Sequence, residues 1–194
     1  MRLQALAIAM VIVSGVAVFI MSFSTVDSLF ETRERYYRES RFADVFAALK
    51  RAPEALAWRA EGLAGVDRVQ TRVVAFVSLD IAGFPEPVSA HVVSLPGQEG
   101  PGLLNQVHLH SGRLPEPGRD DEALVSVELA KAHGLAAGDR LAATINGRRE
   151  RQTLVGLARS PDYIYQFAPG AMFPDPARYG ILWMGREALG TAYD

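Results

Sequence analysis

The chain opens with an apolar segment that is long enough to cross a membrane as a helix. Between Leu3 and Val26 there are 24 residues without a charged side chain, and 18 of them are apolar. At about 1.5 Å per residue this helix would be roughly 36 Å long, whereas a bilayer's hydrocarbon core is about 30 Å thick. The segment has no polar stripe at helical spacing, unlike a helix of a soluble core. We therefore predict a transmembrane helix over residues 1–28.

A secretory signal peptide is the alternative interpretation of this segment. Signal peptides have an apolar stretch of about 7–15 residues and a cleavage site of small residues. Here the stretch is longer, and its end, from Phe19 to Phe23, has no Ala-x-Ala site. The sequence favours an uncleaved anchor. Its orientation stays open, because the arginines after the span favour a cytoplasmic C-terminal side, whereas long domains cross membranes largely regardless of charge.

Residues 29–194 alternate between helical and strand periodicity, which predicts one domain of the α+β class. Strands are expected over residues 69–81, 88–95, 106–110, 123–126, 141–145, 149–158 and 179–184. Helices are expected over 27–39, after Pro53, over 127–133 with a stop at Gly134, and over 187–193. Asn146-Gly147 is the strongest hairpin signal, because a type I′ turn needs a positive φ at both central residues.

One further helix is predicted from four apolar residues with spacings of three and four: Phe42, Val45, Phe46 and Leu49. Asp44, Lys50 and Arg51 lie on the opposite side, so the helix is amphipathic. We expect its apolar face to pack on the strand at 69–81. In that case Phe46→Ala would destabilise the domain by about 3–5 kcal/mol.

Composition excludes several classes of function. Outside the span about 45% of residues are apolar, as in ordinary folded domains. The net charge of −2 gives no general attraction to nucleic acid. The chain has no cysteine, which excludes disulfides, thiol nucleophiles and cysteine-bound zinc. Neither lysine, Lys50 or Lys131, lies in a P-loop, so this chain does not bind ATP in that way.

Candidate chemistry is sparse, and we expect no catalytic, cofactor-binding or metal-binding residues. His108 and His110 would share one face of a strand, but no third ligand lies close in the sequence. The acidic run from Asp120 to Glu122 is interpreted as a solvated loop. A different feature is the aromatic loop of residues 160–178. It either packs over the domain edge or forms a partner-contact loop, and its candidate residues are Tyr163, Tyr165, Phe167 and Phe173.

The order of several short motifs carries a family resemblance. After the span and the Phe42–Pro53 segment come Gly65-Val66, Thr71-Arg72-Val73-Val74 and Ser94-Leu95-Pro96, and then Gly112-Arg113-Leu114-Pro115-Glu116-Pro117-Gly118, Ala130-Lys131-Ala132-His133-Gly134-Leu135, Gly138-Asp139, Ile145-Asn146-Gly147-Arg148, Ser160-Pro161-Asp162-Tyr163-Ile164-Tyr165 and Tyr179-Gly180-Ile181-Leu182-Trp183-Met184. In this order the chain resembles the first span and the extracytoplasmic core domain of ABC transporter permeases of the FtsX-like family. That family includes MacB and the lipoprotein-releasing Lol permeases.

The resemblance implies a MacB-like periplasmic core, with residues 29–194 outside the cytoplasm at a bacterial inner membrane. It also implies an ATPase in a separate partner subunit, a second permease copy or homologue, and a periplasmic partner or lipid-like cargo. The function implied is not enzymatic: the domain would couple ATP-driven motion to export or release of lipid, lipoprotein or peptide-like cargo. Such permeases carry at least three further spans, so the chain is expected to be an N-terminal portion.

Two alternatives stay open beside this interpretation. The first is a single-span, membrane-anchored periplasmic binding or sensor module. The second is an anchored hydrolase, which would need a pocket that joins His108, His110 and an acidic residue.

Overall fold

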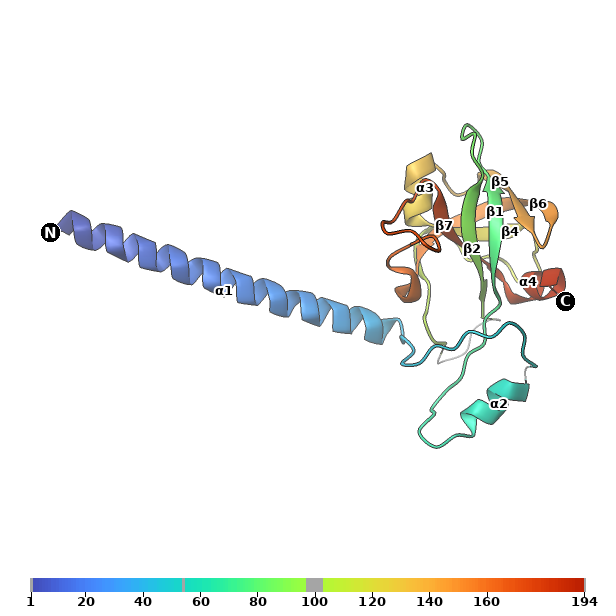
Figure 1. Ribbon diagram of the computed structural model, residues 1–194, viewed down its shortest axis with the longest axis horizontal. Coiled ribbons are helices and arrows are strands. Elements are labelled where there is room, and N and C mark those ends of the chain that lie inside the picture. Colours follow the sequence, from blue (N-terminus) through green and yellow to red (C-terminus); the bar gives the residue numbers. More distant parts are fainter. Residues whose placement is uncertain (1, 54, 97–102, 194) are drawn as a thin grey trace. The chain divides into compact units, whose positions relative to one another are not determined.

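The computed structural model describes residues 2–53, 55–96 and 103–193, and the chain divides into two compact units, Met1–Glu39 and Ser40–Asp194. The first unit is one continuous helix, α1 (Arg2–Glu39), with no buried residue (Figure 1). In the part of the chain that the structure describes, it is the one helix long and apolar enough to cross a membrane. This fits a membrane-anchored protein, although a signal sequence has the same properties.

The helix runs beyond the predicted end of the span at residue 28, as the sequence indicates for residues 27–39. Glu31 and Arg35 form an ion pair one turn apart, with 3.1 Å between Oε1 and Nη2. Such pairs stabilise exposed helices by a few tenths of a kcal/mol. The boundary between the transmembrane helix and the domain at residue 28 stays a prediction.

The second unit contains a closed six-stranded barrel. Around the ring the pairs are β1–β2, β2–β7, β7–β4, β4–β6, β6–β5 and β5–β1. β3 (His108–Gly112) adds to β6 beside β5. The six barrel strands are β1 (Val74–Asp80), β2 (Val88–Leu95), β4 (Glu122–Ser126), β5 (Arg140–Ile145), β6 (Arg148–Arg159) and β7 (Tyr179–Gly185). The helices of this unit are α2 (Ala55–Glu61), α3 (Val127–His133) and α4 (Arg186–Tyr193), as Figure 1 shows.

The mixture of helices and strands agrees with the predicted α+β class, while the closed barrel is a new finding. Several elements match their predicted ranges closely, including β2, α3 and the turn between β5 and β6. In that turn Asn146 and Gly147 have φ angles of 44° and 76°, as a type I′ turn requires. Gly134 ends α3 in the left-handed conformation, with φ of 65°.

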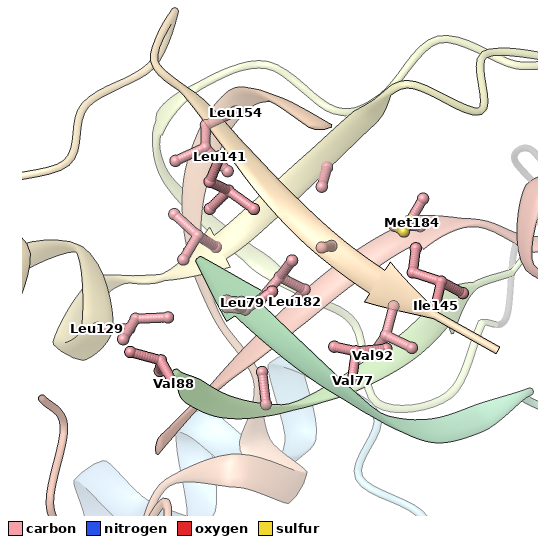
Figure 2. Packing of buried hydrophobic residues seen from close by; sticks show 14 of the residues in the cluster. Val77, Leu79, Val88, Val92, Leu129, Leu141, Ile145, Leu154, Leu182 and Met184 are labelled. Carbon is pink, nitrogen blue, oxygen red and sulfur yellow. The ribbon is translucent and has the colours of Figure 1, made fainter. Parts of the chain in front are cut away.

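Two apolar clusters fill the unit. The larger one lies inside the barrel and includes Leu79, Val92, Leu141, Leu154 and Leu182, all fully or almost fully buried (Figure 2). The smaller one contains Leu124, Tyr179, Ile181 and Trp183. Neighbouring residues of β7 therefore serve opposite clusters, because successive side chains of a strand point to opposite faces.

The predicted amphipathic helix over residues 42–51 is wrong. These residues form no helix, and Val45, Phe46 and Leu49 are exposed. At the start of this segment the backbone bonds to Asn105 instead of forming a helical turn. The Asn105 amide donates to the Arg41 carbonyl, and the Ala43 amide donates to Asn105 Oδ1. Phe46 is 56% exposed, so Phe46→Ala would remove no buried contact. The loss of stability predicted from the sequence is therefore no longer expected.

The strand predicted from residue 69 begins later, at Val74. Before that point side chains pair with a distant loop instead of a neighbouring strand. Gln70 Oε1 accepts from the Leu104 amide at 2.6 Å, and Arg72 donates to the Leu104 and Asn105 carbonyls at 2.7 and 2.8 Å. Val73 then marks the approach to the sheet, because its carbonyl accepts a hydrogen bond from the Ser94 amide of β2 at 2.8 Å.

Glu122 corrects the interpretation of the acidic run as a solvated loop. Its carboxylate is buried and accepts two hydrogen bonds from Arg113, at 2.6 and 2.7 Å, and one from the Glu116 amide at 2.9 Å. The Gly112–Gly118 motif is thus a loop folded around one buried carboxylate. The hydrogen bonds from Arg113 lower the pKa of Glu122.

We expect Glu122→Gln to lower the free energy of unfolding by about 1–2 kcal/mol at pH 7, because a charge-assisted bidentate pair is lost. The folded-state pKa lies below the unfolded one, so the carboxylate stabilises the fold above its ordinary pKa of 4.5. This contribution is lost as the pH falls through the lowered pKa. The difference in Tm between wild type and Glu122→Gln, measured on the full chain in detergent, should therefore shrink below pH 4.5. Glu116→Gln, which removes only an exposed carboxylate 3.5 Å from the same Arg113, is the control. A difference in Tm that does not change with pH would contradict this role of Glu122.

Candidate partner-contact surface

The aromatic loop of residues 160–178 connects β6 to β7 and is fastened at its start. It begins with a short 3-10 helix, Pro161–Tyr163, whose Pro161 is buried. Tyr163 packs against the smaller apolar cluster. Burial and the neighbouring Asp162 carboxylate raise the pKa of Tyr163 to about 12, so its hydroxyl stays protonated. Of the four predicted contact residues, Tyr163 is thus part of the packing.

Gln166 anchors the middle of the loop through buried polar contacts. It is 6% exposed, and its Oε1 accepts from Ser126 Oγ at 2.9 Å. Its Nε2 donates to Glu128 Oε2 at 3.1 Å, and Glu128 is in turn paired with Arg159 at 2.8 Å. Ser126 Oγ also accepts from the Ile181 amide at 3.3 Å. Gln166 therefore ties the loop directly to β4 and α3, and its partners Ser126 and Glu128 are in turn bonded to β7 and β6.

The residues on either side of Gln166 face outward. Tyr165 is 74% exposed and Phe167 is 43% exposed, with their ring centroids 6.1 Å apart. Further along the same loop Met172 and Phe173 are also exposed. Aromatic residues and methionine are enriched in protein interfaces. We call Tyr165, Phe167, Met172 and Phe173 the aromatic surface, and its role in partner contact stays a prediction.

A second fastening joins the loop to residues 104–105. Arg72 Nη1 lies 3.6 Å from Asp162 Oδ2, and both side chains are largely buried. Desolvation lowers the pKa of Arg72, which is partly offset by the Asp162 charge. The opposite side of the Arg72 guanidinium holds the carbonyls of Leu104 and Asn105. The loop is therefore held at Asp162 and at Gln166, on either side of the exposed Tyr165.

We expect Gln166→Leu to lower the free energy of unfolding by about 1–2 kcal/mol, because the buried Ser126 hydroxyl and the half-buried Glu128 carboxylate each lose a hydrogen bond. Limited proteolysis of the full chain in detergent should then cut the loop faster than in wild type. Tyr165→Ala removes an exposed neighbour and should change stability by at most about 0.5 kcal/mol. Equal proteolysis of Gln166→Leu and wild type would contradict the anchoring role.

The histidines do not form a shared site. His108 Nε2 lies 2.6 Å from Ser40 Oγ, whereas His110 is exposed beside a register shift in β3. His91 pairs with the Tyr179 hydroxyl at 2.7 Å, and burial lowers its pKa. Among the described residues there is no group of three or more His, Cys, Asp or Glu that could hold a metal ion.

Two pockets lie away from the aromatic surface. One, of about 330 Å³, is lined by residues that include Trp58, Glu61, Gln70 and Arg186. The other, of about 290 Å³, is lined by Arg41, Phe42, Asp67, Arg68 and Leu104. Neither is lined by His108 or His110, so the anchored-hydrolase alternative finds no support in them.

Sequence reasoning found the exposed aromatics but missed their anchor. Gln166 carries no local signal of burial, because its partners Ser126 and Glu128 are about forty residues away. The local alternation is the reverse of a typical half-buried strand: the polar Gln166 points inward and the aromatic neighbours point outward.

Comparison with known proteins gives a weak structural likeness and no sequence match. No protein-family model matches the sequence, and no curated protein matches it. One similar solved structure is the extracellular domain of the noncanonic ABC-type transporter YknZ from Gram-positive bacteria, with 11% sequence identity and a TM-score of 0.45. The match covers 72% of this chain and 65% of that one. A similarity this weak does not establish a shared fold or function.

Proposed function

We propose that the chain is the N-terminal portion of the permease subunit of an ABC transporter. In this proposal α1 anchors it in a bacterial inner membrane, and the barrel unit lies outside the cytoplasm. A separate ATPase subunit drives the motion, and a second permease copy or homologue completes the transporter. The domain couples that motion to export or release of lipid, lipoprotein or peptide-like cargo. The observation that carries the proposal is the joint order of the family motifs after a single apolar helix.

The motifs behind the resemblance have structural roles in this chain. Gly112 to Gly118 surrounds the buried Glu122 carboxylate. At Gly138-Asp139 the glycine has a φ of 100°, and Asp139 Oδ2 accepts from the Ala136 amide at 2.8 Å. These residues shape the barrel unit.

The aromatic surface is the part of this unit that we assign to partner or cargo contact. Exposed aromatic side chains on a fastened loop bind at low cost in conformational entropy, because the loop is already ordered before contact. Gln166, Arg72 and Asp162 supply this order through the contacts described above. The surface fits a periplasmic protein partner or an apolar cargo.

The first experiment asks whether an ATPase belongs to the protein. The full-length gene product would be tagged in its native host and purified in mild detergent. We expect an ATPase subunit with a P-loop to copurify in a fixed ratio and to hydrolyse ATP in the complex. Purification without any such subunit would overturn the permease proposal and favour the single-span binding or sensor module.

The second experiment tests the aromatic surface in the same complex. A photocrosslinking residue replaces Tyr165, and the matched control carries it at Arg149, an exposed residue of the β5–β6 hairpin. We expect crosslinks from position 165 whose yield changes when the ATPase is trapped with vanadate, and no such change from position 149. Equal yields at position 165 in both nucleotide states would contradict a coupling role for the surface.

A further inference from the structure

The aromatic surface contains one sulfur atom, the thioether of Met172, and this side chain is 85% exposed. No other large apolar side chain of the described residues is more exposed. Of the other described methionines, Met184 is 2% exposed in the larger apolar cluster, and Met10 and Met21 belong to the apolar part of α1. The chain has no cysteine. In the described part of the barrel unit, exposed sulfur is therefore found at Met172 alone.

The backbone on both sides of Met172 is fixed by turns. Before it, residues 168–171 form a turn with a hydrogen bond of 2.9 Å from the last amide to the first carbonyl. Proline and glycine occupy the centre of this turn, and the glycine has a φ of 82°, as a type II turn requires. After it, the Asp175 carbonyl accepts from the Arg178 and Tyr179 amides at 3.1 and 2.9 Å. The thioether is thus presented to solvent on a short stretch that is held at both ends.

We propose that Met172 is an oxidation site that regulates the aromatic surface. The proposal rests on the proposed function of that surface as a contact site, and the oxidant is a hydroperoxide such as hydrogen peroxide. The thioether sulfur attacks one peroxide oxygen, so a sulfur–oxygen bond forms as the oxygen–oxygen bond breaks. The second oxygen leaves as hydroxide and takes the proton of the first, which gives water. The thioether is oxidised to the sulfoxide, and the peroxide is reduced.

Oxidation at this position would change what the surface can bind. A thioether is a flexible apolar group, whereas a sulfoxide carries a polar oxygen that accepts hydrogen bonds. A partner that covers Met172 and Phe173 with apolar atoms would bury this oxygen without a donor, which weakens binding. The rings of Tyr165 and Phe167 keep their chemistry. The sulfoxide therefore lowers the affinity of a surface that is otherwise intact, and enzymatic reduction of the sulfoxide reverses the change.

The same reaction has a different consequence at Met184. That side chain packs among buried residues of the larger apolar cluster, so a sulfoxide there would place a polar oxygen in the core. At Met172 the fold is spared, because so little of this side chain is covered by the barrel unit. Exposure thus makes Met172 both the accessible methionine and the one whose oxidation the fold tolerates. These are the properties that a regulatory modification needs.

The first test measures the modification itself and does not depend on the proposed function. The full chain in detergent is treated with hydrogen peroxide, and samples taken over time are digested and mapped by mass spectrometry. We expect the sulfoxide to form at least about tenfold faster at Met172 than at Met184, which is the matched buried control. Equal rates at the two positions would overturn the proposal.

The second test measures contact in the complex with the ATPase, with the photocrosslinking residue at position 165. We expect peroxide to lower the crosslink yield at least about fivefold in the chain that keeps Met172. In Met172→Leu, which has no sulfur at this position, the yield before and after peroxide should be the same. A methionine sulfoxide reductase should restore the yield of the oxidised complex.

Two outcomes of the second test would overturn the proposal. One is an equal loss of crosslinks with Met172 and with Met172→Leu, because another group would then be the target of the oxidant. The other is an unchanged yield after mass spectrometry has shown that Met172 is oxidised. If position 165 gave no crosslinks even before peroxide, the proposed contact function of the surface would be wrong, and this regulation would fall with it.

Discussion

Replacement of Trp183 by alanine is expected to lower the free energy of unfolding by about 3–5 kcal/mol. Trp183 lies in the middle of β7, is fully buried and is a member of the smaller apolar cluster. Its cross-strand partners Leu124 and Val93 are also buried, so the cavity left by alanine would be lined by side chains already held in place. For a unit of this size each kcal/mol corresponds to about 2–4 °C in Tm. Far-UV circular dichroism of the full chain in detergent would measure the shift.

Trp183→Phe separates packing from hydrogen bonding at the same position. Among the described residues, the indole Nε1 of Trp183 is buried without a hydrogen-bond partner. Phenylalanine keeps most of the apolar volume and removes this unsatisfied donor, whose burial costs about 1–3 kcal/mol. We therefore expect Trp183→Phe to stay within about 1 kcal/mol of wild type. If Trp183→Phe and Trp183→Ala lowered the free energy of unfolding equally, the indole Nε1 would have to form a hydrogen bond in the folded protein.

Local patterns predicted most elements of the barrel unit because their causes are local. The alternation in β2, the left-handed stop at Gly134 and the Asn146-Gly147 turn each depend on a few neighbouring residues. Closure of the barrel depends on pairing of β1 with β5 and of β4 with β6, which joins residues far apart in the chain. No periodicity in the sequence reports such partners. The sequence pattern therefore could not predict that the strands close into a barrel.

The helix predicted around Phe46 is absent for a related reason. Its amphipathic pattern is real, but a pattern states only that one face seeks an apolar surface, and not which molecule supplies it. The prediction assumed the sheet of the same chain. At the aromatic loop the same limit applies, since Tyr163 and Tyr165 are equivalent in sequence terms. Tyr163 packs against the smaller apolar cluster, whereas Tyr165 lies beside Gln166, whose side chain bonds to Ser126 and Glu128; both sets of contacts are long-range.

Gly156→Ala is expected to destabilise the fold by about 2–3 kcal/mol through a clash with backbone atoms. Gly156 lies in β6, opposite Gly112 of β3 on one side and Leu124 of β4 on the other. A Cβ atom there would meet the carbonyl oxygens of Ser111 and Arg113 at 2.7 and 2.8 Å. These oxygens cannot move without disturbing the pairing of β3, which includes the bond from the Arg113 amide to the Val155 carbonyl at 2.9 Å.

A loss of stability in Gly156→Ala would be opposite in sign to the usual effect of replacing glycine with alanine. By reducing the freedom of the unfolded chain alone, a glycine-to-alanine change stabilises a protein by about 0.4–1 kcal/mol. Gly185 in β7 is the matched control, because the nearest atom to an added Cβ is the Arg119 carbonyl oxygen at 3.9 Å. We expect Gly185→Ala to leave Tm unchanged or slightly raised and Gly156→Ala to lower it. Loss of β3 should also expose the Gly112–Gly118 loop, which faster proteolysis there would reveal, whereas equal Tm values for the two variants would mean that β3 can shift to admit a methyl group.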